Sequence, residues 1–203
     1  MAIGDKAIDG VDYYFNGDGT MHTGWLQYGA YWYYYDPSGA MHEGWLQYGG
    51  YWYYLDDAMV VGDKKIDDVD YHFNSDGSMF TGWLQVKETD EEGNEHISWK
   101  YFDASGSGKD GWTQVNGTWY HFTDGIMDTD LIEEDGKFYY LDSSGAMRTG
   151  WIYHKDQYEE GRADAWYYFD AAGAAHDGWL QYGDKWYYIE QGDGSTFVQT
   201  RCR

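Results

Sequence analysis

The hydrophobic positions of this chain come in short aromatic runs separated by glycine and aspartate. Residues 24–35, GWLQYGAYWYYY, and residues 44–54, GWLQYGGYWYY, show the pattern most clearly. Each run predicts a β-hairpin, in which a G-W-L-Q strand leads through a tight turn into an aromatic Y-W-Y-Y strand. Asp9-Gly10, Asn116-Gly117 and Asp135-Gly136 are pairs favoured in two-residue type I′ turns, so we expect hairpins to close there.

This pattern recurs about every 20 residues over almost the whole chain. The units start at Gly4, Gly24, Gly44, Gly62, Gly82, Gly111, Asp130, Gly150 and Gly178. A lone hairpin of this length is not stable in water, whereas stacked repeats that bury each other's faces are. We therefore expect residues 1–203 to form a single all-β domain, a repeat β-solenoid of about nine stacked hairpins.

All twelve tryptophans fall in two positions of the unit. The first slot directly follows the unit start and holds Trp25, Trp45, Trp83, Trp112, Trp151 and Trp179. The second slot lies in the aromatic strand and holds Trp32, Trp52, Trp99, Trp119, Trp166 and Trp186. In the short units the slots are seven residues apart, so a two-residue turn puts both indoles on one face, within ring-contact distance. Gln27, two residues from Trp25, faces the same side.

A longer period is superimposed on the units. The units at Gly4, Gly62 and Asp130 lack tryptophan in both slots, whereas the six others carry it twice. The slots of these three units hold Asp5 and Asp12, Asp63 and Asp70, and Leu131 and Phe138. The second unit of two triplets also has a longer acidic loop, at residues 90–93 and 158–161. The sequence therefore predicts triplets of hairpins at 4–61, 62–129 and 130–203.

Composition and charge narrow the class of protein. The 12 Trp and 23 Tyr replace scarce aliphatic residues, so we expect a core built from aromatic rings. The formal net charge is −23, which excludes a basic face for nucleic-acid phosphates or an anionic membrane surface. No apolar run approaches the roughly 18 residues of a spanning helix, and the N-terminus lacks the features of a signal peptide. We expect no nucleic-acid partner and no membrane insertion.

Catalytic motifs are missing from the sequence. It has no Gly-x-Ser-x-Gly, no phosphate loop and no His-Glu-x-x-His. Cys202 is the only cysteine, which leaves no disulfide framework and no Cys-rich metal site. We expect a non-catalytic protein without cofactor or metal, and the sequence leaves its oligomeric state open.

Two segments carry a resemblance to a known family. GWLQYGAYWYYYDPSGAMHEGW and YYLDSSGAMRTGW resemble the choline-binding repeats of Gram-positive surface proteins, phage lysins and autolysins, which merge with glucan-binding and toxin repeats. The resemblance implies a left-handed β-solenoid with about three hairpins per turn. It also implies a secreted protein or one on the bacterial cell surface.

The resemblance also implies where a ligand binds. In the family a ligand lies between consecutive hairpins, held by the two slot aromatics of one repeat and an aromatic of the next. Carried onto this chain, all twelve tryptophans are ligand-binding candidates. The complete sets would be Trp25, Trp32 and Trp45; Trp83, Trp99 and Trp112; and Trp151, Trp166 and Trp179. The pairs Trp45–Trp52 and Trp112–Trp119 would lack a third ring. Met41, Gln27 and Gln85 are candidate neighbours.

Three functions are compatible with these residues. The first is a cell-wall-binding module that holds choline, or the choline groups of teichoic-acid-type polymers, because aromatic faces attract a quaternary ammonium. The second is a glucan- or glycan-binding module, because tryptophan beside glutamine supplies a stacking surface and polar contacts. The third is a structural spacer or interaction stalk.

Overall fold

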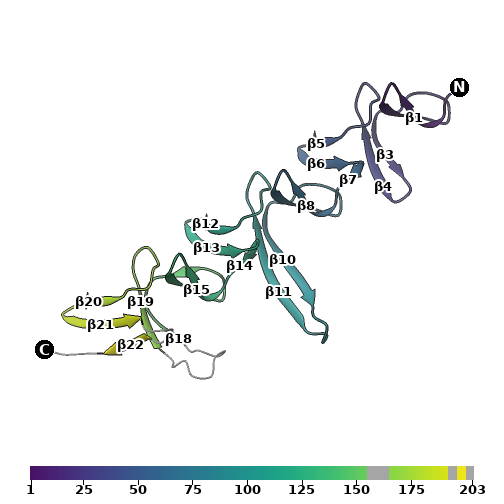
Figure 1. Cartoon of the computed structure of the whole chain (residues 1–203). Coiled ribbons are helices and arrows are strands. Elements are labelled where there is room, and N and C mark those ends of the chain that lie inside the picture. The colour runs from purple at the N-terminus through teal and green to yellow at the C-terminus, as the bar shows by residue number, and fades with distance from the viewer. Residues whose placement is uncertain (155–164, 192–195, 200–203) are drawn as a thin grey trace. The chain divides into compact units, whose positions relative to one another are not determined.

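The chain is a succession of β-hairpins joined by short links (Figure 1). The computed structural model describes residues 1–154, 165–191 and 196–199. The strands are β1 (Gly4–Ile8), β2 (Val11–Phe15), β3 (Gly24–Tyr28), β4 (Tyr31–Tyr35), β5 (Gly44–Tyr48), β6 (Tyr51–Asp56), β7 (Ala58–Met59), β8 (Gly62–Ile66), β9 (Val69–Phe73), β10 (Gly82–Thr89), β11 (Glu95–Phe102), β12 (Gly111–Val115), β13 (Thr118–Thr123), β14 (Ile126–Met127), β15 (Asp130–Glu134), β16 (Lys137–Leu141), β17 (Met147–Arg148), β18 (Gly150–His154), β19 (Ala165–Phe169), β20 (Gly178–Tyr182), β21 (Lys185–Gln191) and β22 (Thr196–Gln199). These residues include no helix long and apolar enough to cross a membrane.

Each hairpin is its own small antiparallel sheet. β3 pairs with β4 from Gly24 opposite Tyr35 to Tyr28 opposite Tyr31, and β5–β6 repeats this register. In four sheets a short third strand, β7, β14, β17 or β22, joins the second strand of its hairpin. Every predicted unit start is the first residue of a strand. The expectation of an all-β chain of repeated hairpins is confirmed.

Backbone conformation explains why glycine and turn residues recur at fixed positions of the repeat. Both residues of Asp9-Gly10, Asn116-Gly117 and Asp135-Gly136 have positive φ, which confirms the predicted type I′ turns. Gly24, the first residue of β3, has φ +83°, a conformation that residues with a Cβ rarely adopt. The positive φ directly before the first slot accounts for glycine at the start of this unit.

In eight of the nine hairpins of the described residues, one residue near the end of the second strand is almost fully buried. These side chains are at most 3% exposed, and they are Tyr35, Leu55, Phe73, Phe102, Phe122, Leu141, Phe169 and Ile189. Burying a large apolar side chain contributes roughly 1.5–3 kcal/mol to stability. Each of these residues therefore stabilises the hairpin that carries it. The expected aromatic core is met only in part. Four phenylalanines and two tyrosines are buried, but aliphatic residues such as Leu55, Leu141 and Ile189 share the core, and no tryptophan of the described residues belongs to the buried set.

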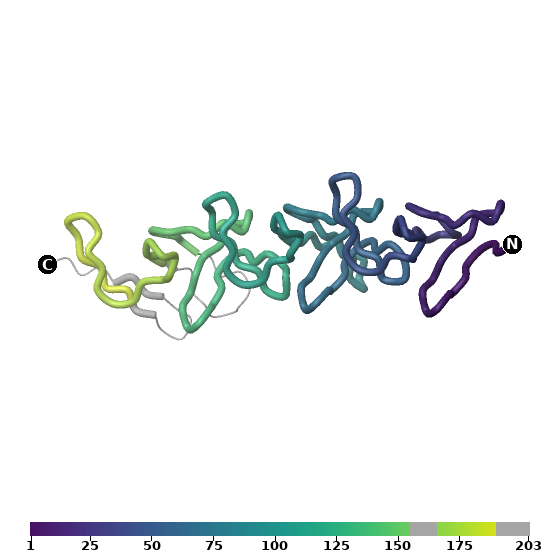
Figure 2. Tube along the Cα trace, turned by 90° about the horizontal axis from the view of Figure 1, so that it is seen from above, coloured from purple at the N-terminus to yellow at the C-terminus, as the bar shows by residue number. Residues whose placement is uncertain are grey.

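Backbone hydrogen bonds connect several links to the hairpin two before them in the chain. Met41 N donates to Asp12 O at 2.8 Å, and Met79 N donates to Trp52 O at 2.7 Å. Ala175 N donates to Phe138 O at 2.8 Å in the same way. In each case the link that follows one hairpin bonds to the second strand of the preceding hairpin. Figure 2 traces the hairpins and links along the chain. This bond holds successive hairpins side by side.

The chain divides into two compact units, one of residues 1–86 and 100–109 and the other of residues 87–99 and 110–203. The triplet boundaries, the single domain and the number of hairpins per turn stay predictions. Of the two acidic loops, residues 158–161 lie outside the described residues.

Candidate functional site

The two faces of a hairpin carry different residues. In the hairpin β3–β4, Trp25 lies opposite Tyr34 and Gln27 lies opposite Trp32, so these four share one face. Leu26 and its partner Tyr33 lie on the other face. The Trp25 and Trp32 rings contact each other edge to face, with centroids 6.5 Å apart. The predicted same-face arrangement of the two slots is confirmed.

A pocket of about 320 Å³ opens on the tryptophan face of this hairpin. Its lining residues come from four successive segments and are Trp25, Trp32, Tyr53, Met59, Ser75 and Asp76. The Tyr53 ring on β6 stands edge to face against Trp25, with centroids 5.2 Å apart. Gly77, which follows Asp76, leaves room for Met59, because a Cβ at Gly77 would overlap the Met59 sulfur.

The third ring of the pocket is Tyr53, where the sequence predicted Trp45. Tyr53 pairs with Leu46, and Trp45 pairs with Tyr54, so Tyr53 and Trp45 lie on opposite faces of one hairpin. The face that carries Tyr53 is turned toward the preceding hairpin. In the hairpin β5–β6 the tryptophans and Tyr53 therefore face different neighbouring hairpins.

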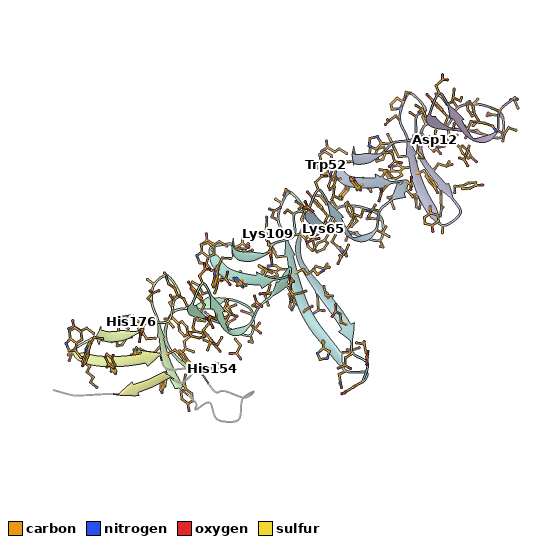
Figure 3. The ribbon with its side chains drawn as sticks, viewed as in Figure 1. Asp12, Trp52, Lys65, Lys109, His154 and His176 are labelled. Atoms are coloured by element: carbon orange, nitrogen blue, oxygen red, sulfur yellow. The ribbon has the colours of Figure 1, made fainter. Side chains whose placement is uncertain are left out.

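The tryptophans of β5–β6 form an equivalent group with the following hairpin. Trp45 contacts Trp52 at 6.2 Å and Tyr71 at 4.9 Å between ring centroids. Met79, whose backbone bonds to Trp52, holds the place that Met59 holds in the first pocket. Figure 3 labels Trp52 on this hairpin. The prediction that this pair lacks a third ring is wrong, because the ring comes from a tyrosine position that the tryptophan-poor unit retains.

The second compact unit repeats the arrangement. Trp112 contacts Tyr139 at 4.7 Å, so the pair Trp112–Trp119 also has a third ring. Trp151 contacts Tyr187 at 5.1 Å, where the sequence predicted Trp179. The predicted set of Trp83, Trp99 and Trp112 draws on both compact units, and its grouping stays a prediction.

Trp179 and Trp186 differ from the other pairs. Trp179 contacts Trp186 at 6.4 Å and Tyr188 at 5.1 Å, all within one hairpin. Its side chain is 59% exposed, whereas Trp25 and Trp45 are half-buried. Within the described part of the chain, no ring from another hairpin contacts this pair.

The two slots differ in burial as well. First-slot Trp25, Trp45 and Trp112 are half-buried between hairpins. Second-slot Trp32 and Trp52 are 39% and 41% exposed. One indole is thus fixed by packing, and the other presents its ring to solvent.

Two of the predicted neighbours, Met41 and Gln27, lie outside the lining of the Trp25 pocket. Met41 bonds through its backbone to Asp12 of the first hairpin, and Met59 lines the Trp25 pocket in its place. Gln27, directly opposite Trp32, and Gln85, on β10, are exposed. Sequence reasoning missed Tyr53 and Asp76 and chose Met41 from the recurring methionine position that also holds Met59. Strand alternation was the available signal for the tyrosine.

Two positions between hairpins are filled by the protein's own side chains. At the tryptophan-poor unit of β8–β9, the first slot is Asp63, and Lys100 occupies the third-ring position of the next hairpin. Lys100 Nζ lies 2.9 Å from Asp63 Oδ2. At β15–β16 the first slot is Leu131, which packs against the buried Tyr167. Figure 3 labels Asp12, the second slot of the remaining tryptophan-poor unit.

The first pocket carries a negative charge at its edge. Hydrogen bonds from the Ser78 hydroxyl and backbone N–H lower the pKa of Asp76, so the carboxylate stays ionised at neutral pH. Burial, together with the charge of Asp76, raises the pKa of Tyr53, so its ring stays neutral. Three neutral aromatic rings and one carboxylate form a site suited to a small organic cation.

Comparison with known proteins identifies related sequences and folds. The sequence matches the choline-binding repeat over residues 2–42. It matches the cell wall binding repeat over residues 43–58, 64–79, 110–127, 129–147, 163–175 and 177–195. No curated protein sequence matches the chain.

Three solved structures from Streptococcus pneumoniae have similar folds. Choline binding protein F is 26% identical, with 97% of this chain and 87% of that chain covered and a TM-score of 0.59. The choline-binding domain of CbpL is 24% identical, with both chains covered completely and a TM-score of 0.58. CbpJ is 24% identical, with 97% and 81% covered and a TM-score of 0.62.

Proposed function

The chain belongs to the family of choline-binding, cell wall binding repeats, and from this premise we propose that it holds choline groups in the aromatic pockets between its hairpins. The repeats of this family are binding modules. The single observation that carries the proposal is the pocket of Trp25, Trp32, Tyr53 and Met59 with Asp76 at its edge. The equivalent ring contacts around Trp45, Trp112 and Trp151 extend it to further sites.

The chemistry of the pocket suits a quaternary ammonium. Its nitrogen carries no N–H to donate in a hydrogen bond, so aromatic faces and a nearby negative charge supply the attraction. Each favourable ring contributes about 0.5–2 kcal/mol. The attraction of three rings is partly offset by the loss of freedom on binding. The resulting binding free energy is near −4 kcal/mol, which corresponds to a dissociation constant of about 1 mM.

The natural partner in this proposal is a choline-bearing polymer of the teichoic-acid type. Weak sites joined on one chain bind a polymer more tightly than any single site does, because each later contact is intramolecular. Such polymers belong to the cell wall, so the protein acts outside the cell, on the bacterial surface. This placement rests on the cell wall binding repeat.

A choline titration followed by intrinsic tryptophan fluorescence and by calorimetry tests the proposal. We expect a saturable change with a midpoint in the low millimolar range. Tetramethylammonium should reproduce it, and tert-butanol, a neutral group of similar shape, should not. A flat response to choline up to tens of millimolar would overturn the proposal.

Glycan binding is the second candidate, and one observation favours it. Gln27 is exposed and lies directly opposite the exposed ring of Trp32, so a sugar could stack on the indole and bond to the amide. Dextran in the same fluorescence titration distinguishes the two ligands. A response to neither choline nor dextran would leave the spacer function.

A further inference from the structure

We propose that Asp76 makes the Trp25 pocket a site for primary ammonium groups, such as that of ethanolamine or a lysine side chain, in addition to choline. The inference rests on the proposed function, since it concerns the same pocket. It names the residue that sets which cations this pocket accepts. The Trp45 site has Ser105 at the link position that corresponds to Asp76, so it would keep its preference for quaternary ammonium.

The carboxylate of Asp76 has one oxygen engaged and one available. Oδ1 accepts the Ser78 hydroxyl at 2.6 Å and the Ser78 backbone N–H at 3.0 Å. These bonds orient the side chain at the pocket edge. Oδ2 accepts no hydrogen bond from any residue that the structure describes. The site therefore offers a fixed anionic acceptor beside three rings.

An acceptor of this kind distinguishes between classes of ammonium. A quaternary ammonium gains only the Coulomb attraction of Asp76, which is screened by solvent and salt at an exposed side chain. A primary ammonium gains in addition a charge-assisted N–H···O hydrogen bond, about twice as strong as a neutral one. Asp76 should therefore contribute more to binding a primary than a quaternary ammonium.

The chain itself pairs a carboxylate with a primary ammonium in the corresponding region of the repeat. Lys100 takes the place that Tyr53 takes in the first pocket, and its Nζ lies 2.9 Å from Asp63. The side chain of Lys100 is 27% exposed, so most of it is covered by protein, while its partner Asp63 is 56% exposed. The space between consecutive hairpins thus accommodates a primary ammonium when a carboxylate faces it.

The repeat supplies matched positions for comparison. Ser105 occupies, in the link beside Met79, the position of Asp76 in the link beside Met59, because Gly106 packs on Met79 as Gly77 packs on Met59. Asp18 makes the same two bonds as Asp76, from the Thr20 backbone N–H at 2.9 Å and its hydroxyl at 2.6 Å. Asp18 is therefore a control for the turn itself.

The test uses ¹⁹F NMR of the full chain labelled with 5-fluorotryptophan, with the Trp25 and Trp45 signals assigned by substitution to phenylalanine. Choline and ethanolamine are titrated separately. We expect Asp76→Asn to weaken ethanolamine binding at Trp25 about tenfold and choline binding less than threefold. Asparagine keeps an acceptor for Ser78 N–H, so the link should fold as before. Asp18→Asn should change neither ligand. Ser105→Asp removes the hydroxyl bond to Asp103, so it is made together with Asp103→Asn, which copies the Asn74–Asp76 spacing; this variant should strengthen ethanolamine binding at Trp45 severalfold.

The outcomes separate this inference from the proposed function. Suppose that choline shifts the Trp25 and Trp45 signals. If Asp76→Asn then leaves the affinity for ethanolamine unchanged, or lowers the affinities for choline and ethanolamine by the same factor, the role of Asp76 is overturned and choline binding stands. If choline shifts neither signal, the proposed function is overturned. Selective loss in Asp76→Asn with selective gain in the double variant Asp103→Asn, Ser105→Asp supports the inference.

Discussion

At the scale of single residues, the site depends on which face of a strand each aromatic ring occupies. Trp45 and Tyr53 belong to one hairpin but serve different sites, because Trp45 pairs with Tyr54 and Tyr53 pairs with Leu46. The tyrosine extends toward Trp25 of the preceding hairpin, and the tryptophan toward Tyr71 of the following one. A single substitution should therefore disable one site and leave its neighbour intact.

The first prediction concerns choline binding by the variants Tyr53→Leu and Trp45→Leu. Tyr53→Leu should weaken choline binding at Trp25 by about three- to thirtyfold, the loss of one cation–π contact, and should leave the Trp45 site unchanged. Trp45→Leu should abolish the Trp45 site and affect Trp25 little. Site-resolved ¹⁹F titrations measure both, with the Trp52 signal as the reporter of the second site where Trp45 is replaced. Equal loss at Trp25 from both variants would support the arrangement with Trp45 as third ring and refute the present one.

Acid stability is the second prediction and concerns the link residue Asp103. Partial burial acts to raise the pKa of Asp103, but hydrogen bonds from Lys109 and Ser105 outweigh it and hold the pKa at about 2. The unfolded chain has an aspartate pKa of about 3.9. The stabilisation is therefore complete above about pH 4 and is lost as the pH falls through about 2.

Urea unfolding of the wild type and Asp103→Asn between pH 2 and pH 6 checks this. The variant should be the less stable at pH 6, and the gap between the two midpoints should close toward pH 2. A gap that stays constant across the range would show that the ionised carboxylate contributes nothing.

At the scale of the hairpin, the sequence was sufficient for most of the element. Glycine before the first slot, an Asn-Gly or Asp-Gly turn and alternating aromatics are all local signals, and the strands begin where these signals place them. The two-residue turn also fixes the register, so the shared face of Trp25 and Trp32 followed from their spacing.

Contacts between hairpins could not be predicted in the same way. The identity of the third ring depends on which face turns toward the preceding hairpin, and no residue within one hairpin specifies this. Met59 and Asp76 reach the Trp25 pocket from later segments of the chain. The ion pair between Lys100 and Asp63 could not be predicted either. In its own strand each residue looks like an ordinary exposed polar residue, and nothing there indicates a partner in another hairpin.

The third prediction converts the filled position into a ligand site. Asp63, Asp70 and Lys100 stand in the first slot, the second slot and the third-ring position. The triple variant Asp63→Trp, Asp70→Trp, Lys100→Tyr should bind one additional choline, with an affinity similar to that of the other sites. Calorimetric stoichiometry measures the gain. The single variant Lys100→Tyr is the control and should add none. An unchanged stoichiometry in a folded triple variant would contradict the claim that the two slots and the third-ring position together form a choline site.

At the scale of the whole molecule, the net charge of −23 acts on every ligand that approaches. Choline carries one positive charge, whereas phosphocholine carries the same ammonium beside a negative phosphate. The acidic chain attracts the first and repels the phosphate of the second, and dissolved salt screens both effects over about 10 Å at 0.1 M.

The fourth prediction follows from this charge. At 10 mM ionic strength free choline should bind more tightly than phosphocholine, and the ratio of the two affinities should approach one as salt rises to 0.5 M. Calorimetric titrations of both ligands at the two salt concentrations provide the measurement. A ratio that does not change with salt would exclude a role for the overall charge.

Nuclear Overhauser effects from choline methyl protons are the most direct test of the central claim, that a cation binds between two tryptophans of one hairpin and a tyrosine of the next. In the complex of the full chain with choline, the account predicts effects to the rings of Trp25, Trp32 and Tyr53 and a separate set to Trp45, Trp52 and Tyr71. Effects to Trp25 and Trp45 in one set without Tyr53, or to the exposed pair Trp179 and Trp186 alone, would contradict it.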